Sequence, residues 1–517
     1  MKRFLITVAV VVAIGLPVVP AHANGPTVNG AGSTWSQNAI DQWRADVAKN
    51  GITINYQGVG SSAGRQFYIQ NQVDFAVSEI PFESDEQQAL AQEQKSYVYL
   101  PIVAGGTSFM YNLRDAAGNR IRDLRLSGLT LGKIFTKQIN YWDDSAITAD
   151  NNGRVLPHQA IQTVARSDGS GTTAQFTTYL WKMYPSIWCP FAQANGINPC
   201  RYTSNWPSAQ GFELQNGSDG VANYVANDST GAGAITYVET SYALQRGFPV
   251  AAMQNQSGAY TLPTSRNVAI ALTKAKINPD HTQNLDAVYV NPDPNTYPVS
   301  SYSYMIEPTK GFDPAKGNVL GQFILYFACT GQRKADQLGY SPLPPNLVKI
   351  VFEAEQQMPG APKPPQLSKC DNPTIQGGVG SVSNSTGGSL SSAPGATSGG
   401  AGAPSGSNGG GSGGGGTSSG GSGSGSGSGA GLVGGSGGTA GSGLASGGTG
   451  STSGLVGGGA YASSGSLNGS NQALPSVSVK SKPPSWLPLA TVALIVCLVV
   501  VLPPLFAITG VAKKKGY

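Results

Sequence analysis

Hydrophobic and polar residues alternate with two different periods along the first two thirds of the chain. Ile52, Ile54 and Tyr56 occupy every second position, which predicts a strand. Ala39, Trp43 and Val47 recur just before it at the spacing of one helix face. Both patterns return further along the chain, which is typical of an α/β fold.

A second helix and strand are expected after the first pair. The run Ser84-Asp85-Glu86-Gln87 fits a capping box, which predicts a helix from Ser84 to about Lys95. The apolar residues that follow, through Tyr97 and Pro101 to Val103, predict a strand.

The N-terminal end is apolar and fits a secretory signal peptide. Lys2 and Arg3 precede an apolar run, and Ala21-His22-Ala23 resembles a signal-peptidase site. Residues 1–23 are therefore expected to be removed on export, and the body to lie outside the cytoplasm.

The C-terminal end predicts a membrane anchor. Residues 486–512 carry no charge, and about 20 apolar residues suffice to cross a bilayer. Three lysines follow at 513–515, so the positive-inside rule predicts a single-pass cell-membrane helix with residues 513–517 in the cytoplasm. A signal for a covalent cell-wall or lipid anchor is the alternative, although no LPxTG-like motif is found.

Glycine is concentrated in one segment before this span. Residues 377–469 hold 39 of the 71 glycines, mostly beside Ser, Thr and Ala. Such a composition cannot bury a core, so residues 372–485 are expected to be a disordered linker. Residues 24–371 remain as a globular body, large enough for two lobes.

The charge of the body excludes one class of partner. Seven of the 32 Lys and Arg lie in the leader or beside the C-terminal apolar run, which leaves 25 against 27 Asp and Glu. Without clustered basic residues, nucleic acid is not an expected partner.

The body contains four cysteines, an even number that favours disulfides in an oxidising compartment. Three pairings are possible. The local one, Cys189 with Cys200 and Cys329 with Cys370, is favoured.

Three short clusters of Gly, Ser and Thr stand before helical patterns and carry the candidate chemistry: Gly30-Ala31-Gly32-Ser33-Thr34, Gly60-Ser61-Ser62-Ala63-Gly64 and Asp168-Gly169-Ser170-Gly171-Thr172. Each offers backbone N–H groups, hydroxyl groups and the positive end of a helix dipole, which together suit an oxyanion. Arg166 precedes the third cluster and supplies the fork that binds a tetrahedral oxyanion. Glu79 ends a strand pattern and could accept a hydrogen bond from a protonated oxyanion, which favours hydrogen phosphate over sulfate.

These motifs occur in an order that resembles one family. GAGSTW from Gly30, YQGVGSSAG from Tyr56, VDFAVSE from Val73, RSDGSGTT from Arg166, and the later DGVANYV and GAITYVE resemble the phosphate-binding protein of the bacterial high-affinity phosphate ABC importer. The resemblance implies an α/β fold of the two-lobed class II periplasmic-binding-protein type with two crossovers. Lobe one would comprise residues 24–103 and 297–371, and lobe two residues 104–296.

The resemblance also implies the site and the partners. Inorganic phosphate would bind between the lobes, and Asp168 would brace the arginine; the implied contacts are Thr34, Trp35, Ser61, Glu79, Arg166, Ser170, Gly171 and Thr172. The receptor would act as a monomer without cofactor or metal and deliver phosphate to an ABC permease. Trp35 stands where the family commonly has Phe, and Glu79 where it usually has Asp.

Two other functions remain open from the sequence. Gly60-Ser61-Ser62-Ala63-Gly64 matches the G-x-S-x-G elbow of serine hydrolases, whose triad would need His158 or His281. The same match occurs in the glycine-rich segment, so this signal is weak and an enzyme is not expected. A surface adhesin built on a binding-protein fold is the second alternative.

Overall fold

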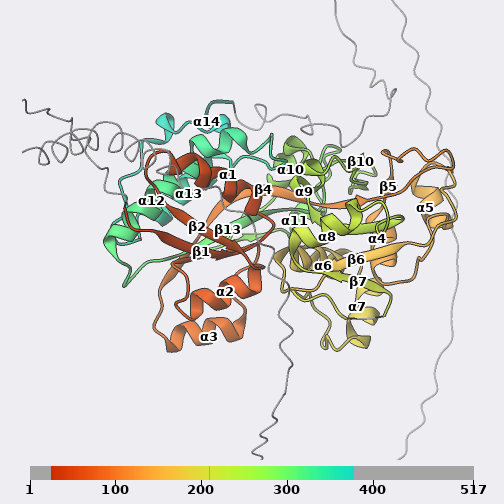
Figure 1. Cartoon of the computed structure of the whole chain (residues 1–517), viewed down its shortest axis with the longest axis horizontal. Helices are drawn as coiled ribbons and strands as arrows, with labels where there is room; N and C mark the ends of the chain where they lie inside the picture. Colours follow the sequence, from red (N-terminus) through yellow and green to blue (C-terminus); the bar gives the residue numbers. More distant parts are fainter. Residues whose placement is uncertain (1–24, 209, 378–517) are drawn as a thin grey trace, which may run out of the picture. The chain divides into compact units, whose positions relative to one another are not determined.

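The computed structural model describes residues 25–377 except residue 209 (Figure 1). The predicted signal peptide, the span at 486–512, the cytoplasmic tail and nearly all of the predicted linker lie outside these residues. Within the described part of the chain, no helix is both long and apolar enough to cross a membrane.

One half of an eight-stranded sheet is built mainly from the N-terminal part of the chain. Its strands run in the order β2-β1-β3-β13-β4. The first three are parallel, whereas β13 pairs antiparallel with both neighbours. Their bounds are β1 Val28–Gly32, β2 Ile54–Gly58, β3 Phe75–Ser78, β4 Tyr97–Tyr111 and β13 Ser300–Pro308.

The other half of the sheet continues from the same β4 strand. It adds β8, β6 and β7 in that order, and β6 is parallel to both of its neighbours. The bounds are β6 Gln162–Arg166, β7 Phe212–Gln215 and β8 Ala234–Glu239. The body is therefore a two-lobed mixed α/β fold whose lobes share β4.

Strand β4 is longer than the sequence predicts, because it does not end at Val103. Residues up to Gly106 pair with β13, and residues from Thr107 pair with β8. A Cβ added at Gly105, within this strand, would lie 2.7 Å from the Trp35 ring. This glycine permits close packing in the middle of a strand rather than a turn.

Helices cover both faces of the first half-sheet (Figure 1). Helices α1, α12 and α13 lie on one face, and α2 and α3 lie on the other. The bounds are α1 Gln37–Ala48, α2 Ser61–Ile69, α3 Ser84–Gln92, α12 Pro314–Ala328 and α13 Pro345–Glu355. The first helix buries Ala39, Trp43 and Val47, as its pattern predicts.

Helix α3 begins at Ser84, as the sequence predicts, but its capping box lies one residue earlier and the helix ends at Gln92 rather than at about Lys95. Glu83 rather than Ser84 is the N-cap, and the Glu86 carboxylate accepts from the Glu83 backbone N–H at 2.8 Å. Buried Arg65 donates to the same carboxylate at 2.7 Å. This ion pair fixes the Glu86 carboxylate, so the capping box forms with Glu83 rather than with Ser84.

Helices α4 to α11 and several short strands lie between β4 and β13 in the chain. The helices are α4 Gly128–Phe135, α5 Ser145–Asp150, α6 Gly171–Met183, α7 Pro185–Ala194, α8 Gly217–Ala226, α9 Thr240–Gln245, α10 Ser265–Leu272 and α11 Asp286–Tyr289. Short strands pair as β10-β9-β5 and β11-β12, with bounds β5 Arg125–Leu126, β9 Ala252–Gln254, β10 Tyr260–Thr261, β11 Lys276–Ile277 and β12 Gln283–Asn284.

Two disulfides join Cys189 to Cys200 and Cys329 to Cys370. This is the local pairing that the sequence favours.

The folded body extends past residue 371, where the sequence analysis begins the linker. Two 3₁₀ segments, Thr330–Lys334 and Leu367–Lys369, precede the short helix α14 Pro373–Gly377. Asn372 is buried and donates to the carbonyls of Ala328 and Leu343 at 3.2 and 3.1 Å. These hydrogen bonds hold Asn372 against the folded body. The composition of the chain from residue 372 onward did not predict this packing.

Candidate functional site

The three glycine clusters lie at the carboxyl ends of three strands. The first includes the end of β1, the second and third follow β2 and β6, and they lead into α1, α2 and α6. The second and third helices begin inside their clusters, with Gly60 and Ser170 as N-caps. Backbone N–H groups at helix N-termini are thus present in both lobes.

Arg166 is the last residue of β6 and is held by Asp168. Its Nε donates to Asp168 Oδ1 at 2.7 Å, and a second guanidinium nitrogen donates to Oδ2. The Gly217 backbone N–H also donates to Oδ1, at 2.9 Å. Burial would raise the pKa of Asp168, but the hydrogen bonds and charge of Arg166 hold that pKa below its ordinary value.

The remaining N–H groups of Arg166 bond to Thr34 in the first lobe and to Ser218 in its own lobe. Nη2 donates to Thr34 Oγ1 at 3.1 Å, and Nη1 donates to Ser218 Oγ at 3.3 Å. The hydroxyls of Thr34 and Ser218 share a hydrogen bond of 2.9 Å. The first and third clusters therefore meet at one point, although 132 residues separate Thr34 from Arg166.

The second cluster meets the third beside this point. The Gly171 backbone N–H donates to Ser61 Oγ at 3.1 Å, and the Ser62 N–H donates to the Gly169 carbonyl at 3.1 Å. Gly60 has a φ of 90°, and a Cβ there would lie 2.5 Å from Asp168 Oδ2. These contacts describe lobes that are closed on each other.

Glu79 is buried between the clusters with both carboxylate oxygens in hydrogen bonds. Ser61 Oγ donates to Oε2 and Ser303 Oγ donates to Oε1, each at 2.8 Å. Burial raises the pKa of Glu79 above its ordinary value, although the hydroxyls of Ser33, Ser303 and Ser61 oppose this effect. A Cβ added to Gly171 would lie 2.0 Å from Oε2, so the carboxylate touches the start of α6.

The other predicted contacts lie at the same helix starts. The Trp35 backbone N–H donates to Ser33 Oγ at 2.9 Å, and its ring is buried against Tyr340. Ser170 Oγ caps α6 by accepting from the Thr173 N–H. Thr172 Oγ1 is buried and has no hydrogen-bond partner among residues 25–377. All the predicted site residues thus lie at or beside this junction of the lobes.

Comparison with known proteins identifies the family. A family model described as a PBP superfamily domain matches residues 18–330. The phosphate-binding protein PstS of Xylella fastidiosa strain Temecula1 is 32% identical over 326 residues, which are 63% of this chain and 83% of that protein. The PstS of Pasteurella multocida is 30% identical over 345 residues, which are 66% of this chain and 94% of that protein.

This chain belongs to the PstS family of phosphate-binding proteins, within the PBP superfamily. A solved structure of a high affinity periplasmic phosphate-binding protein bound with phosphate has the same fold, with a TM-score of 0.50 at 20% identity. The match covers 66% of this chain and 100% of that one.

Two site residues of this PstS-family chain were not predicted from the sequence. Ser218 bonds to Thr34 and Arg166, and Ser303 bonds to Glu79 and to Ser36. Gly217-Ser218 opens α8 as the other clusters open their helices, so the same Gly-Ser signal could have found Ser218. Ser303 lies within β13 and carries no such local signal.

The hydrogen bonds around the two histidines do not form a hydrolase triad. His158 pairs with Asp143 at 2.8 Å and stacks on Tyr141, and His281 lies 3.3 Å from the Tyr99 carbonyl. In the described part of this PstS-family chain, no hydrogen bond joins either histidine to the serines of the second cluster.

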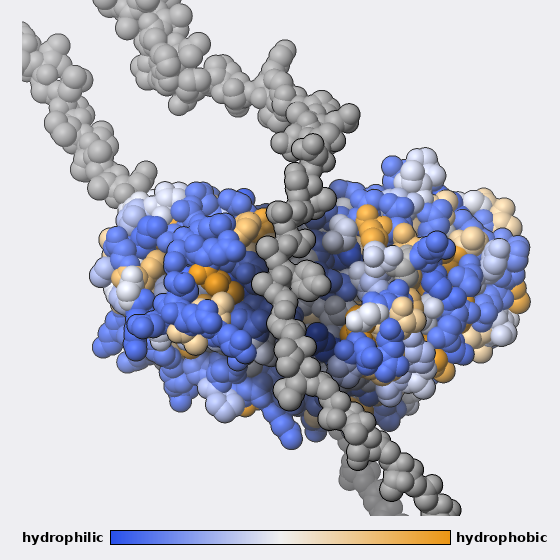
Figure 2. Space-filling view, turned by 90° about the horizontal axis from the view of Figure 1, so that it is seen from below, coloured by the Kyte–Doolittle hydropathy of each residue, from blue (hydrophilic) through white to orange (hydrophobic). Residues whose placement is uncertain are grey.

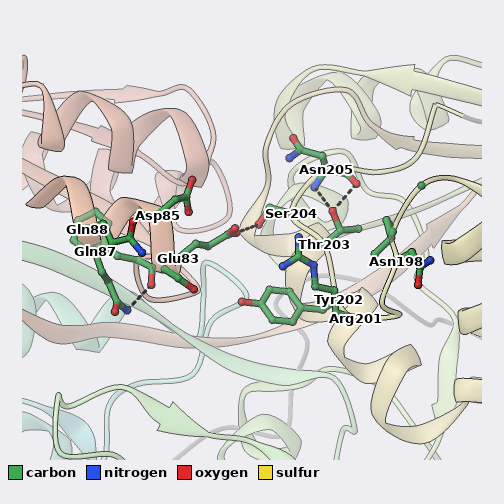
Figure 3. A pocket seen from close by; sticks show the side chains of 14 residues that line it. Glu83, Asp85, Gln87, Gln88, Asn198, Arg201, Tyr202, Thr203, Ser204 and Asn205 are labelled. Atoms are coloured by element: carbon green, nitrogen blue, oxygen red, sulfur yellow. Dashed lines mark hydrogen bonds between the residues drawn. The ribbon is translucent and has the colours of Figure 1, made fainter. Parts of the chain in front are cut away.

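A polar groove of about 690 Å³ lies next to the site (Figure 3). Glu83 and Asp85 at the start of α3 line one side, and residues 196–198 and 201–205 line the other. The Ser204 hydroxyl donates to Glu83 Oε1 at 3.3 Å across the groove, while the Ser204 carbonyl accepts from the Ser170 N–H. The face of the molecule drawn in Figure 2 is mostly hydrophilic.

Proposed function

We propose that this protein captures inorganic phosphate between its two lobes and delivers it to an ABC permease. One observation carries the proposal: Arg166, fixed by Asp168, donates its other N–H groups to the hydroxyls of Thr34 in the first lobe and Ser218 at the start of α8. Membership of the PstS family supports phosphate as the ligand.

The donors suit a dehydrated oxyanion. Hydroxyl groups of Thr34 and Ser61, the Arg166 guanidinium and the N–H groups at the start of α6 would replace the hydration shell when the lobes close. Trp35 would contribute its backbone N–H, and the remaining contacts would come from Ser170, Gly171 and Thr172. No covalent step is required of these groups.

Glu79 would select the protonated form of the ligand. An ionised carboxylate accepts a hydrogen bond but cannot donate one, so it suits hydrogen phosphate and leaves fully ionised sulfate opposite an acceptor. Its placement against Gly171 supports contact with a ligand held by α6.

We also propose the arrangement of the whole chain. The chain passes from the first half-sheet to the second within β4 and returns to the first at β13. This path supports one lobe at residues 24–103 with 297–371 and another at 104–296. The uncharged run at 486–512, followed by lysines, supports a membrane anchor with the binding body outside the cytoplasm.

The Arg166→Ala variant tests the proposal. Removing the Arg166 guanidinium takes away a charge-assisted donor and leaves Asp168 buried without its cation. Phosphate affinity should therefore fall by at least about a hundredfold. Isothermal titration with phosphate measures the change. Ser62→Ala is the matched control, because among the described residues Ser62 bonds to the other lobe only through its backbone N–H. Equal losses of phosphate affinity in the two variants would contradict the proposal.

A further inference from the structure

A fourth helix start lies at the junction of the lobes, beside the three clusters. Gly217 and Ser218 are the first two residues of α8, and the Gly217 N–H donates to Asp168 Oδ1 at 2.9 Å. Ser218 is fully buried, and a Cβ added to Gly217 would lie 3.7 Å from Thr34 Cγ2. Helix α8 therefore presents its N-terminal end to Thr34, the residue of the first lobe that bonds to Arg166.

Both lone pairs of the Thr34 hydroxyl oxygen are occupied. Thr34 Oγ1 accepts from Arg166 Nη2 at 3.1 Å and from the Ser218 backbone N–H at 3.2 Å. A hydroxyl group has two lone pairs and one proton. The 2.9 Å hydrogen bond between the hydroxyls of Thr34 and Ser218 is therefore donated by Thr34.

The same count leaves the proton of the Ser218 hydroxyl without an acceptor. Ser218 Oγ accepts from the Thr34 hydroxyl at 2.9 Å and from Arg166 Nη1 at 3.3 Å, which occupies both of its lone pairs. Within residues 25–377, as far as they are described, this hydroxyl makes no other hydrogen bond. A buried donor without an acceptor is unfavourable, so a ligand oxygen that accepts from Ser218 gains affinity.

The surroundings of Ser218 specify an acceptor with negative charge. The two hydrogen bonds that Ser218 Oγ accepts, one of them from a guanidinium, polarise its O–H and strengthen its donation. The positive end of the α8 dipole also favours an anion here. Because Thr34 and Ser218 belong to different lobes, opening of the lobes would admit the anion to this hydroxyl, and closure would then enclose it.

We propose that Ser218 is a further ligand contact, which donates its hydroxyl to an ionised oxygen of the bound anion. This inference rests on the proposed function, since it takes phosphate as the ligand. It also orients the ligand: the protonated oxygen faces Glu79, which accepts, and an ionised oxygen faces Ser218, which donates. Thr34 then acts on the anion through Ser218, because the Thr34 proton is donated to Ser218 Oγ.

The Ser218→Ala variant of the full chain tests the donor. It removes one hydrogen bond to a charged acceptor, so phosphate should bind about tenfold to a hundredfold more weakly in isothermal titration. Ser218→Thr keeps the hydroxyl and should retain most of the affinity of the parent. An unchanged affinity in Ser218→Ala, or equal losses in the two variants, would overturn the proposal.

Ser265→Ala is the matched control. Ser265 is the first residue of α10, is buried, and has an Oγ without a hydrogen-bond partner among the described residues. Its replacement should leave the phosphate affinity unchanged. The ³¹P chemical shift of bound phosphate should change in Ser218→Ala and stay at the value of the parent in Ser265→Ala. Equal effects of the two variants would overturn a contact between Ser218 and the anion, and circular dichroism checks that each variant is folded.

Sulfate tests the orientation of the ligand. In the Glu79→Gln background the amide can donate, so the anion need not be protonated. There, Ser218→Ala should weaken phosphate and sulfate by the same factor, because both anions offer Ser218 an ionised oxygen. A loss for phosphate alone would overturn the assignment of an ionised oxygen to Ser218.

The parent chain separates failure of this inference from failure of the proposed function. A folded, ligand-free parent that binds neither anion would overturn the proposed function and the role of Ser218 with it. A parent that binds phosphate no more tightly than Ser218→Ala would overturn the role of Ser218 alone.

Discussion

Glu79 is the single residue on which ligand selection depends most. Its carboxylate is buried, accepts from two serine hydroxyls and touches Gly171 of the other lobe. An aspartate, usual at this position in the family that the motifs resemble, would be shorter by one C–C bond of about 1.5 Å. The longer side chain helps the carboxylate of Glu79, which directly follows β3, to reach the start of α6.

Replacing Glu79 by Gln should reduce the discrimination between phosphate and sulfate. The amide can donate to a fully ionised oxyanion, which the carboxylate cannot do, so sulfate binding should strengthen at least about tenfold relative to phosphate. Competition titrations with the two anions measure the ratio. An unchanged ratio in Glu79→Gln, with Glu79→Asp as the charge-conserving control, would show that selection lies elsewhere.

Residue types and spacing could predict most of this site, because the donors occur in short local clusters. Thr34 and Ser61 each stand in such a cluster, and Arg166 lies two residues before one. Ser303 could not be predicted, since its contact with Glu79 depends on the pairing of β13 with β3, across 224 residues of sequence. The sequence also does not indicate that Ser218 and Thr34 bond across the lobes.

At the scale of elements, the N-terminus of α6 must approach the first lobe closely. Gly171→Ala should weaken phosphate binding about tenfold or more, because a Cβ would lie 2.0 Å from Glu79 Oε2 and keep the lobes apart. Gly132→Ala in α4 is the matched control, since its Cβ would meet side-chain atoms no closer than 3.3 Å. Phosphate titration of both variants checks this, and equal affinities would contradict the close approach.

A second prediction at this scale concerns two buried carboxyl groups on β13 and α13. Burial raises the pKa of Glu355 from its ordinary value of 4.5 to about 7, and burial together with the Glu355 charge raises the pKa of Glu307. The folded protein therefore holds protons that the unfolded chain releases, and stability should fall as pH rises from about 4.5 towards 7.

Glu355→Gln should remove part of this pH dependence. The variant should gain stability relative to the parent at pH 8 and gain little at pH 5, where the Glu355 carboxyl is protonated in the parent. Urea midpoints at the two pH values measure the difference. Parallel midpoints for variant and parent would mean that Glu355 does not titrate in this range.

Hydrophobic periodicity predicted the helices and strands that a local pattern specifies. It misplaced element ends and caps that depend on tertiary contacts. Trp43 and Val47 marked α1 correctly, whereas the apolar pattern predicted a strand only as far as Val103, and β4 continues because both half-sheets pair with it. The α3 cap moved to Glu83 because Arg65, distant in sequence, binds Glu86.

At the scale of the whole molecule, the order of motifs predicted a two-lobed mixed α/β body. The composition of the chain could not predict where that body ends. Asn372 belongs to the body through tertiary hydrogen bonds, which composition does not indicate. The contacts between lobes are likewise tertiary: they join β1, β6 and α8 through Thr34, Arg166 and Ser218.

We propose that the closed lobes hold hydrogen phosphate. Isothermal titration of the full chain with phosphate and with sulfate is the most direct test. The account predicts a single phosphate site of micromolar or tighter affinity, with sulfate at least about a hundredfold weaker because Glu79 lacks a donor for it. Absence of phosphate binding by folded, ligand-free protein, or equal affinity for the two anions, would contradict it.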